Sequence, residues 1–176
     1  MIKIAVTGPE STGKSSLSKI YGEKYAAIIV PEFARQWLEE RPHYRYTCED
    51  VEWMAQEQFR LQTEALQSSS HLIVCDTDLL VYRVWMDVVF GKCPKWIEAE
   101  AERNNFDFTF LMDIDLAWEA DPLREHPHLR EELFFRYLNL LENSGRPFGI
   151  VSGDATERYQ NSLTLLKKQS IIIPQR

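Results

Sequence analysis

The sequence predicts an α/β fold in which a parallel, five-stranded sheet is covered by helices on both faces, giving a three-layer sandwich. Apolar runs of strand length alternate with segments of helical periodicity along the 176 residues. The runs that read as strands are mostly apolar, as expected for strands that are buried on both faces. Glycine and proline punctuate the junctions between them. Such alternation of strands and helices is typical of a mostly parallel sheet.

The first half of the chain is divided clearly by proline, glycine and serine. In the first helix Leu17, Ile20 and Tyr21 share one face, and the second strand stops at Pro31. Pro42 closes the helix that follows strand 26–30. Between residues 49 and 66 apolar residues recur at roughly helical spacing, and the three serines at 68–70 end that pattern. In chain order, the predicted segments are strand 2–7, helix 15–25, strand 26–30, helix 32–40, helix 49–66 and strand 72–75.

The second half begins with a stretch whose length decides its assignment. This stretch is almost wholly apolar apart from Arg83 and Asp87, is too long for a typical strand, and ends at Gly91, so a buried helix is expected. The remaining elements follow from apolar runs and from helical periodicity. In chain order, the predicted segments are helix 79–90, strand 106–112, helix 131–141, strand 148–151, helix 156–167 and a short edge strand 170–173.

Composition limits the class of protein and its partners. The net charge of −7 argues against a duplex nucleic-acid partner, because affinity for phosphate backbones needs a basic face. The apolar runs are of strand length, which predicts no membrane span, and the N-terminal residues show no export leader. Three cysteines without a Cys-x-x-Cys pair favour reduced thiols over a disulfide framework or a zinc site. We therefore expect a cytoplasmic protein; its oligomeric state is not predicted.

Residues 8–15 carry the strongest motif, a full G-x-x-x-x-G-K-[ST] pattern between a strand and a helix. In a P-loop NTPase such a loop turns its amide groups and the start of the helix toward the phosphates of ATP. Lys14 is expected to reach the β- and γ-phosphates, and Ser15 to ligate Mg²⁺. A structural glycine turn with a solvent-exposed lysine is the alternative. The predicted nucleotide contacts are Gly8, Glu10, Ser11, Thr12, Gly13, Lys14, Ser15 and Ser16.

Two acids follow the apolar strand at 72–75, as in a Walker B element. In P-loop enzymes a carboxylate at this position holds Mg²⁺, usually through water. Asp76 is the predicted metal residue, while Asp78 is expected to assist with Mg²⁺ or to contact the acceptor. The alternative is that these acids cap the helix that begins near residue 79.

Acceptor residues are expected after the second strand, because ligands bind at the C-terminal edge of open parallel sheets. Glu32 is the candidate general base or hydroxyl anchor, and Arg35 a contact for substrate or phosphate. A glutamate placed there only for the helix dipole is an equally simple explanation. Trp85 and Trp118 are candidates for stacking on a flat ring, although a tryptophan among valines is more often part of the core.

An irregular segment at about residues 115–130 follows the fourth strand and contains Pro122 and Pro127. We interpret it as a lid whose Arg124 and Arg130 would close on the transferring phosphate and neutralise charge that develops in the transition state. Ordinary surface arginines are the alternative.

Taken together, these motifs resemble the nicotinamide riboside kinase domain of the bacterial trifunctional NAD-synthesis and regulator protein, and its stand-alone relatives described as AAA-type ATPases. The similarity extends over nearly the whole chain. Outside the generic phosphate loop it is carried by residues 32–35, 76–78, 84–85, 90–91, 93–94, 96–97, 118–119 and 121–127.

The resemblance implies a nucleoside-kinase-like fold with a lid, and transfer of phosphate from ATP to the ribose 5′-hydroxyl of nicotinamide riboside, giving nicotinamide mononucleotide. Two alternatives stay open. The acceptor could be another nucleoside or deoxynucleoside, or the chain could be an ATP-dependent switch that hydrolyses ATP slowly and acts through its lid. Acceptor-dependent release of ADP separates a kinase from a switch.

Overall fold

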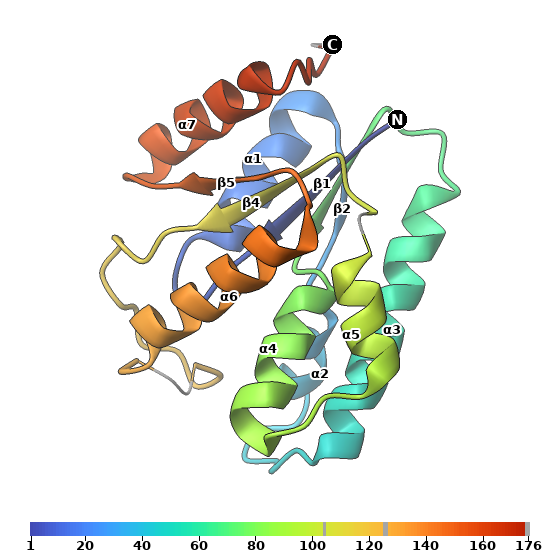
Figure 1. The fold of residues 1–176 in the computed structure, drawn as a ribbon, viewed down its shortest axis with the longest axis vertical. Coiled ribbons are helices and arrows are strands. Elements are labelled where there is room, and N and C mark those ends of the chain that lie inside the picture. Colours follow the sequence, from blue (N-terminus) through green and yellow to red (C-terminus); the bar gives the residue numbers. More distant parts are fainter. Residues whose placement is uncertain (104, 125–126, 175–176) are drawn as a thin grey trace.

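Five parallel strands form the central sheet in a computed structural model of the chain, which describes residues 1–103, 105–124 and 127–174 (Figure 1). The strand order is β2-β3-β1-β4-β5, and every neighbouring pair is parallel. This confirms the predicted α/β class with a parallel five-stranded sheet. The strand bounds are β1 Ile2–Thr7, β2 Ile28–Val30, β3 Leu72–Asp76, β4 Phe108–Met112 and β5 Phe148–Val151.

Helices cover both faces of the sheet and make the outer two layers (Figure 1). On one face lie α1 and α7; on the other lie α3, α4 and α6, together with the short helices α2 and α5. The helix bounds are α1 Lys14–Tyr25, α2 Phe33–Glu39, α3 Cys48–Leu66, α4 Leu79–Phe90, α5 Lys95–Glu102, α6 Arg130–Ser144 and α7 Ala155–Lys168.

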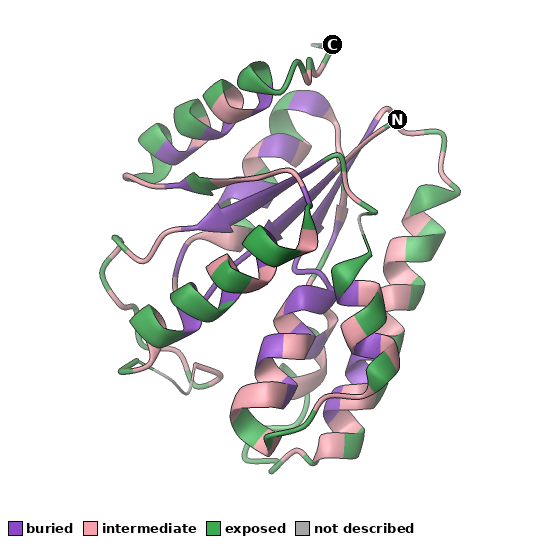
Figure 2. Cartoon of the chain, viewed as in Figure 1, coloured by how far each residue is buried: buried purple, intermediate pink, exposed green. Residues whose placement is uncertain are grey.

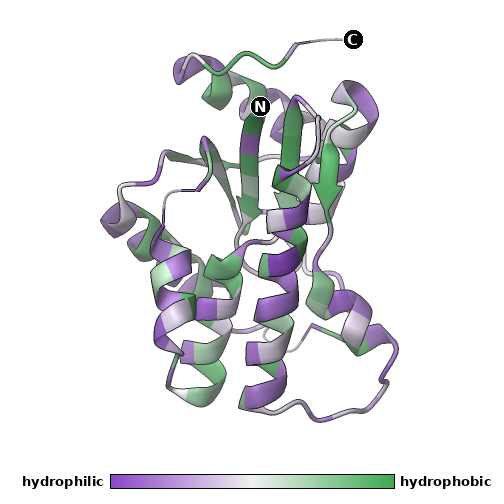
Figure 3. Cartoon of the chain, turned by 90° about the vertical axis from the view of Figure 1, so that its right-hand side faces the viewer, coloured by the Kyte–Doolittle hydropathy of each residue, from purple (hydrophilic) through white to green (hydrophobic). Residues whose placement is uncertain are grey.

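The sheet is the most buried part of the molecule. All residues of β3 and β4 are buried, as the purple strands in Figure 2 show. Figure 3 shows the same strands as the hydrophobic centre, whereas the surrounding helices alternate polar and apolar faces. Burial of apolar surface at roughly 25 cal/mol per Å² is the main force that holds these layers together. The strands are therefore a rigid base for the loops that leave their ends.

Three sequence predictions about elements need correction. The predicted edge strand at 170–173 is not a strand: Ser170 has a φ of 58° and turns the chain, and Ile171 and Ile173 pack on the α1–α7 side of the core. The predicted strand at 26–30 is shorter, because Ala26 ends α1 in the left-handed conformation. Helix α5 was not predicted, although Ile97 and Ala101 lie one turn apart on its buried face.

The loops that leave the carboxyl ends of the strands meet along one edge of the sheet. The glycine-rich loop follows β1, Glu32 follows β2, Asp76 ends β3, and the predicted lid follows β4. Parallel strands bring these ends to the same side, which is where ligands bind in open α/β sheets. Among the helices of the described residues, none has both the length and the apolar character needed to cross a membrane.

Candidate active site

The loop between β1 and α1 is held in shape by its own backbone and side chains. Gly8 has a φ of 131°, and a Cβ atom there would lie 3.0 Å from the carbonyl oxygen of Met112, so only glycine fits without a shift of the backbone. Thr12 donates its hydroxyl to the Pro9 carbonyl at 2.8 Å. The Nζ of Lys14 donates to the carbonyls of Gly8 and Pro9 at 2.9 and 2.7 Å. Contacts within the loop and with β4 therefore define its shape.

Lys14 is the positive centre of a cluster of acids. Burial lowers the pKa of Lys14 below its usual range, whereas the charges of Glu32, Asp76 and Glu10 raise it. These residues come from three different loops, and the parallel sheet brings them together. An ammonium among carboxylates, at the start of a helix whose amides point outward, suits the binding of phosphates together with a metal ion.

Ser15 and Asp76 form the part of the site that fits Mg²⁺. Burial raises the pKa of Asp76, while a hydrogen bond with the Ser15 side chain and the charge of Lys14 lower it. Within the described part of the chain, the buried Oδ1 of Asp76 has no hydrogen-bond partner. Mg²⁺ prefers oxygen ligands and keeps several waters, so a serine hydroxyl beside a carboxylate with an unused oxygen matches its chemistry.

We expect Asp76→Asn to stabilise the ligand-free protein while it weakens the response to Mg²⁺. An acid whose pKa is raised on folding contributes stability that is complete below its ordinary pKa and is lost as the pH rises through the raised value. In EDTA at neutral pH, the variant should therefore unfold at a higher temperature than the natural protein. The difference should shrink as the pH falls toward about 3.9 and vanish below it, where the natural carboxyl is protonated in both states. Thermal unfolding across this range is the measurement, and a lower midpoint at neutral pH would contradict the expectation.

Glu32 occupies the N-cap position of α2 but does not act as its cap. Its side chain makes no capping hydrogen bond; the amide of Phe33 donates instead to Oε1 of Gln58 at 2.8 Å. Burial raises the pKa of Glu32, which Lys14 lowers in part. The explanation of Glu32 as a helix-dipole residue alone is therefore weakened, because its charge interacts with that of Lys14 and the residue lines the site cavity.

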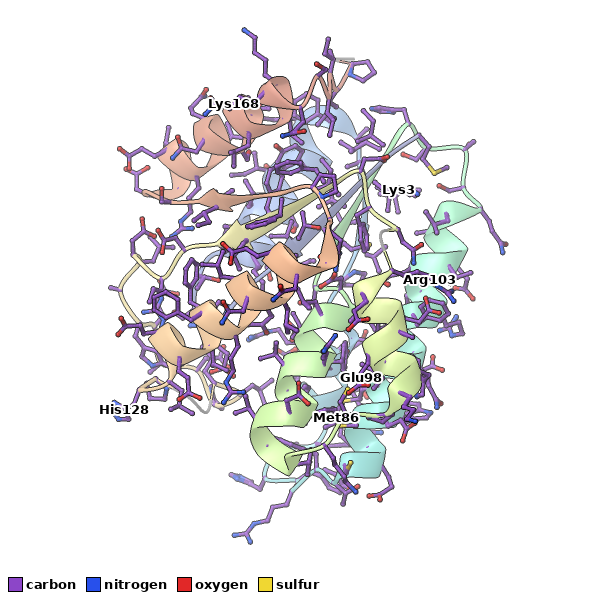
Figure 4. All side chains as sticks on the ribbon, viewed as in Figure 1. Lys3, Met86, Glu98, Arg103, His128 and Lys168 are labelled. Atoms are coloured by element: carbon purple, nitrogen blue, oxygen red, sulfur yellow. The ribbon has the colours of Figure 1, made fainter. Side chains whose placement is uncertain are left out.

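The predicted lid is docked on Ser11 in this structure. The amide of Glu119 and Nη1 of Arg124 donate to the Ser11 hydroxyl at 2.9 and 3.2 Å, and Nη2 of Arg130 donates to the Ser11 carbonyl at 3.1 Å. Arg130 also donates to the Leu116 carbonyl at 3.0 Å. Both arginines thus reach the phosphate loop from the lid. Residues 125 and 126 of the predicted lid lie outside the described residues, and His128 is exposed at the outer edge of the molecule (Figure 4).

Arg124→Ala should lower kcat by about 10²-fold, the usual loss when one donor to a transition-state oxyanion is removed. The affinity for ATP should change much less, because the loop amides and Lys14 remain. Steady-state kinetics combined with calorimetry of ATP binding would separate the two effects. Arg136→Ala is the control, since Arg136 pairs with Glu132 on the exposed side of α6. A variant that loses ATP affinity and keeps kcat would remove Arg124 from the predicted lid role.

A cavity of about 930 Å³ joins the phosphate loop to an apolar region between α2 and α4. The whole of the loop from Gly8 to Ser16 lines it, as do Glu32, Arg35 and Arg124. On the side away from the loop, the apolar lining includes Leu38, Tyr44, Tyr46, Val81, Val84, Trp85, Val88 and Val89. Trp85 meets Tyr46 edge to face, with ring centroids 5.0 Å apart, and donates its indole N–H to the Tyr46 hydroxyl at 3.2 Å.

Two of the predicted substrate residues are placed elsewhere. Asp78 is only 1% exposed and forms a buried ion pair with Arg146 at 2.7 Å, so it does not reach the cavity lining. The guanidinium of Arg130 lies over the ring of Trp118, 5.7 Å from the ring centroid, and Trp118 is not among the residues that line the cavity. The cavity therefore gives no support to Asp78 and Trp118 as substrate contacts, which stay sequence predictions; each side chain lies beside an arginine instead.

Two contacts of the site were not predicted. Arg35 pairs with Asp121 of the predicted lid at 2.7 Å, which ties α2 to that segment. Arg158 of α7 is 2% exposed, donates to the carbonyls of Val151 and Asp113 at 2.7 and 3.1 Å, and pairs with Asp115 at the root of the lid. Only a polar residue on the buried side of the last helix could have indicated this role.

Solved structures share this fold over nearly the whole chain. NadR protein in complex with NR has a TM-score of 0.82 and 18% sequence identity, and the match covers 99% of this chain and 52% of that chain. Deoxyadenosine kinase from M. mycoides has a TM-score of 0.67 and 18% identity, covering 95% and 99% of the two chains. Thymidylate kinase from Ehrlichia chaffeensis has a TM-score of 0.66 and 13% identity, covering 94% and 98%.

At these identities the similarity concerns the fold, and the chain spans about half the length of the NadR chain. The predicted P-loop kinase-like fold is confirmed at this level. A family profile described as an AAA domain matches residues 3–158. The match extends from β1 into α7 and includes every strand that places the phosphate loop and the neighbouring acids, so the chain belongs to the AAA domain family.

Proposed function

We propose that this chain is an ATP-dependent kinase that phosphorylates the ribose 5′-hydroxyl of nicotinamide riboside to give nicotinamide mononucleotide. One observation carries the proposal: a single cavity contains both the phosphate loop and an aromatic-lined region, and Glu32 lies in its lining. A planar base fits beside Tyr44, Tyr46 and Trp85, while its ribose would extend toward the loop. The similarity to NadR protein in complex with NR supports this acceptor.

The residues of the site have distinct roles in this reaction. Lys14 and the loop amides would hold the triphosphate, and Ser15 and Asp76 would hold Mg²⁺, which would supply positive charge to offset that of the phosphates. The oxygen of the ribose 5′-hydroxyl bonds to the γ-phosphorus, and the bond from that phosphorus to the β–γ bridging oxygen breaks. Glu32 accepts the proton that the hydroxyl loses. Burial raises the pKa of Glu32, which strengthens it as a base. Arg124 stabilises the charge of the transferring group from the lid.

The direct test is release of ADP with a panel of nucleosides in the presence of ATP and Mg²⁺. Nicotinamide riboside should give acceptor-dependent ADP and a phosphorylated product identified by mass. Its 5′-deoxy analogue is the matched control, because it keeps the base and ribose contacts but lacks the accepting oxygen. Slow ADP release that no nucleoside accelerates would favour the switch and overturn the kinase assignment.

A second acceptor class is favoured by one observation. The deoxyadenosine kinase of M. mycoides matches 95% of this chain over 99% of its own length, so its size is close to that of this chain. Deoxynucleosides therefore belong in the same panel. A higher kcat/KM for a deoxynucleoside than for nicotinamide riboside would assign the acceptor to that class.

A further inference from the structure

The loop after β2 and the turn after β3 are linked by one buried side chain, that of Gln58 on α3. Gln58 is completely buried. Its Oε1 accepts from the amide of Phe33 at 2.8 Å, and its Nε2 donates to the carbonyls of Pro31 and Thr77 at 3.1 and 3.4 Å. Pro31 and Phe33 flank Glu32, and Thr77 follows Asp76. The amide therefore contacts the backbone on both sides of one candidate catalytic acid and directly after the other.

The turn at Thr77 needs such support. Thr77 has a φ of 94°, a conformation that a β-branched residue rarely adopts and that persists only where its surroundings fix it. Its amide donates to the Val6 carbonyl of β1 at 3.1 Å. Its carbonyl accepts from Gln58 and also from Nε2 of Gln62 at 3.3 Å. Two glutamines one helical turn apart thus hold the strained residue that follows Asp76.

The position of Gln58 in α3 is unusual for a polar residue. Val51, Met54 and Ala55 form the buried stripe of this helix, and Gln58 continues it at the next turn. Helix α3 packs against both α2 and α4, the helices that begin after the two acid-bearing loops (Figure 1). A buried amide is stabilising only when its hydrogen bonds are made, and here both its oxygen and its nitrogen are used.

We propose that Gln58 is a positioning residue that fixes Glu32 and Asp76 relative to each other and to Lys14. Glu32 needs no capping role because Gln58 accepts from the first amide of α2. Asp76 keeps its Oδ1 available because the turn behind it is held by Gln58 and Gln62 through the backbone. The part of this inference that concerns Glu32 rests on the proposed function, in which Glu32 accepts a proton from the acceptor. The part that concerns Asp76 does not, because its placement matters for any Mg²⁺-dependent binding of ATP.

Gln58→Met tests the proposal, because methionine has a similar shape and none of the hydrogen bonds. Without ligands, hydrogen exchange should become faster in residues 31–35 and 76–79. The gain in ATP affinity that Mg²⁺ provides should fall by about 10-fold, the usual loss when a residue that supports metal ligands is changed. Affinity for ATP without metal should be unchanged, and kcat should fall more than the KM for ATP rises.

Met54→Ala is the matched control on the same helix, since Met54 is fully buried and contacts neither loop through a hydrogen bond. It should lower the unfolding temperature but leave exchange in both loops, the Mg²⁺ effect and kcat of the folded protein unchanged. Gln62→Met removes only one of the two donors to the Thr77 carbonyl, so it should destabilise the fold less. It should also reduce the gain in ATP affinity from Mg²⁺ to a smaller degree. If Gln58→Met does not fold, an unchanged gain in Gln62→Met would overturn the proposal.

Two outcomes overturn the proposal: unchanged exchange and Mg²⁺ effect in Gln58→Met, or the same losses in Met54→Ala. Failure of the proposed function is distinguishable from both. If the natural protein phosphorylates no nucleoside while Gln58→Met still loses exchange protection and the Mg²⁺ effect, Gln58 positions the acids and the acceptor assignment is wrong. The exchange and calorimetric measurements need no acceptor.

Discussion

Lys14→Ala should reduce phosphate transfer by about 10³-fold or more, since it removes the only lysine of the phosphate loop and the charge that opposes three carboxylates. Without it, Glu32, Asp76 and Glu10 would repel the triphosphate. The fold should survive, because Gly8 keeps its conformation through the backbone and Thr12 still bonds to Pro9. The loss therefore reflects chemistry at the site and should appear in kcat with saturating ATP.

The measurement is steady-state ADP release with the best acceptor, together with circular dichroism and thermal unfolding of the variant. Lys19→Ala is the control: Lys19 is on the same helix, its side chain is 78% exposed, and its partner Glu23 is one turn away on the surface. That variant should keep full activity. Retention of more than roughly a tenth of the activity in Lys14→Ala would contradict the role of Lys14, since such a loss corresponds to only about 1.4 kcal/mol.

Much of the site could be predicted because its signals are local. The spacing of Gly8, Gly13 and Lys14 fixes a loop whose shape depends on a few neighbouring residues. Glu32 and Asp76 are far apart in the sequence, but each follows an apolar strand, and parallel strands bring their ends to one edge. The meeting of these residues with Lys14 follows from topology alone.

The missed features depend on contacts that are distant in the sequence. Arg158 belongs to a helix that otherwise appears amphipathic and exposed, and nothing beside it indicates that it supports the lid root. Gln58 did leave a signal, as a polar residue on an otherwise apolar stripe, but its partners lie in two separate loops. Asp78 follows an apolar strand, as a metal residue would, and its ion pair with Arg146 could not be read from the sequence.

That partner, Arg146, is 68 residues from Asp78 in the sequence, and their side chains are 1% and 2% exposed. Arg146 also donates to the Ala101 carbonyl at 3.0 Å and lies over the ring of Phe106, 5.3 Å from its centroid. From its place after α6, Arg146 therefore contacts the start of α4, the end of α5 and the segment just before β4. Because both charges are removed from water, each depends on the other.

We expect Arg146→Met to lower the free energy of unfolding by about 3 to 5 kcal/mol, because the carboxylate of Asp78 would stay buried without a partner. The double variant Arg146→Met with Asp78→Asn should recover most of this loss, since no charge is then buried. Urea unfolding, extrapolated linearly to water, measures the three variants and gives the coupling between the two sites.

The exposed pair of Arg136 and Glu132 on α6 has the same N–O distance of 2.7 Å and provides the comparison, with side chains 46% and 55% exposed. Arg136→Met should cost at most about 1 kcal/mol, because water replaces the lost partner. The contrast between the two arginines tests whether burial, rather than contact distance, sets the energy. If Arg146→Met cost no more than Arg136→Met, the fold would not depend on the pairing of Asp78 with Arg146. Asp78 would then be free for the contact with Mg²⁺ or acceptor that its place after β3 first suggested.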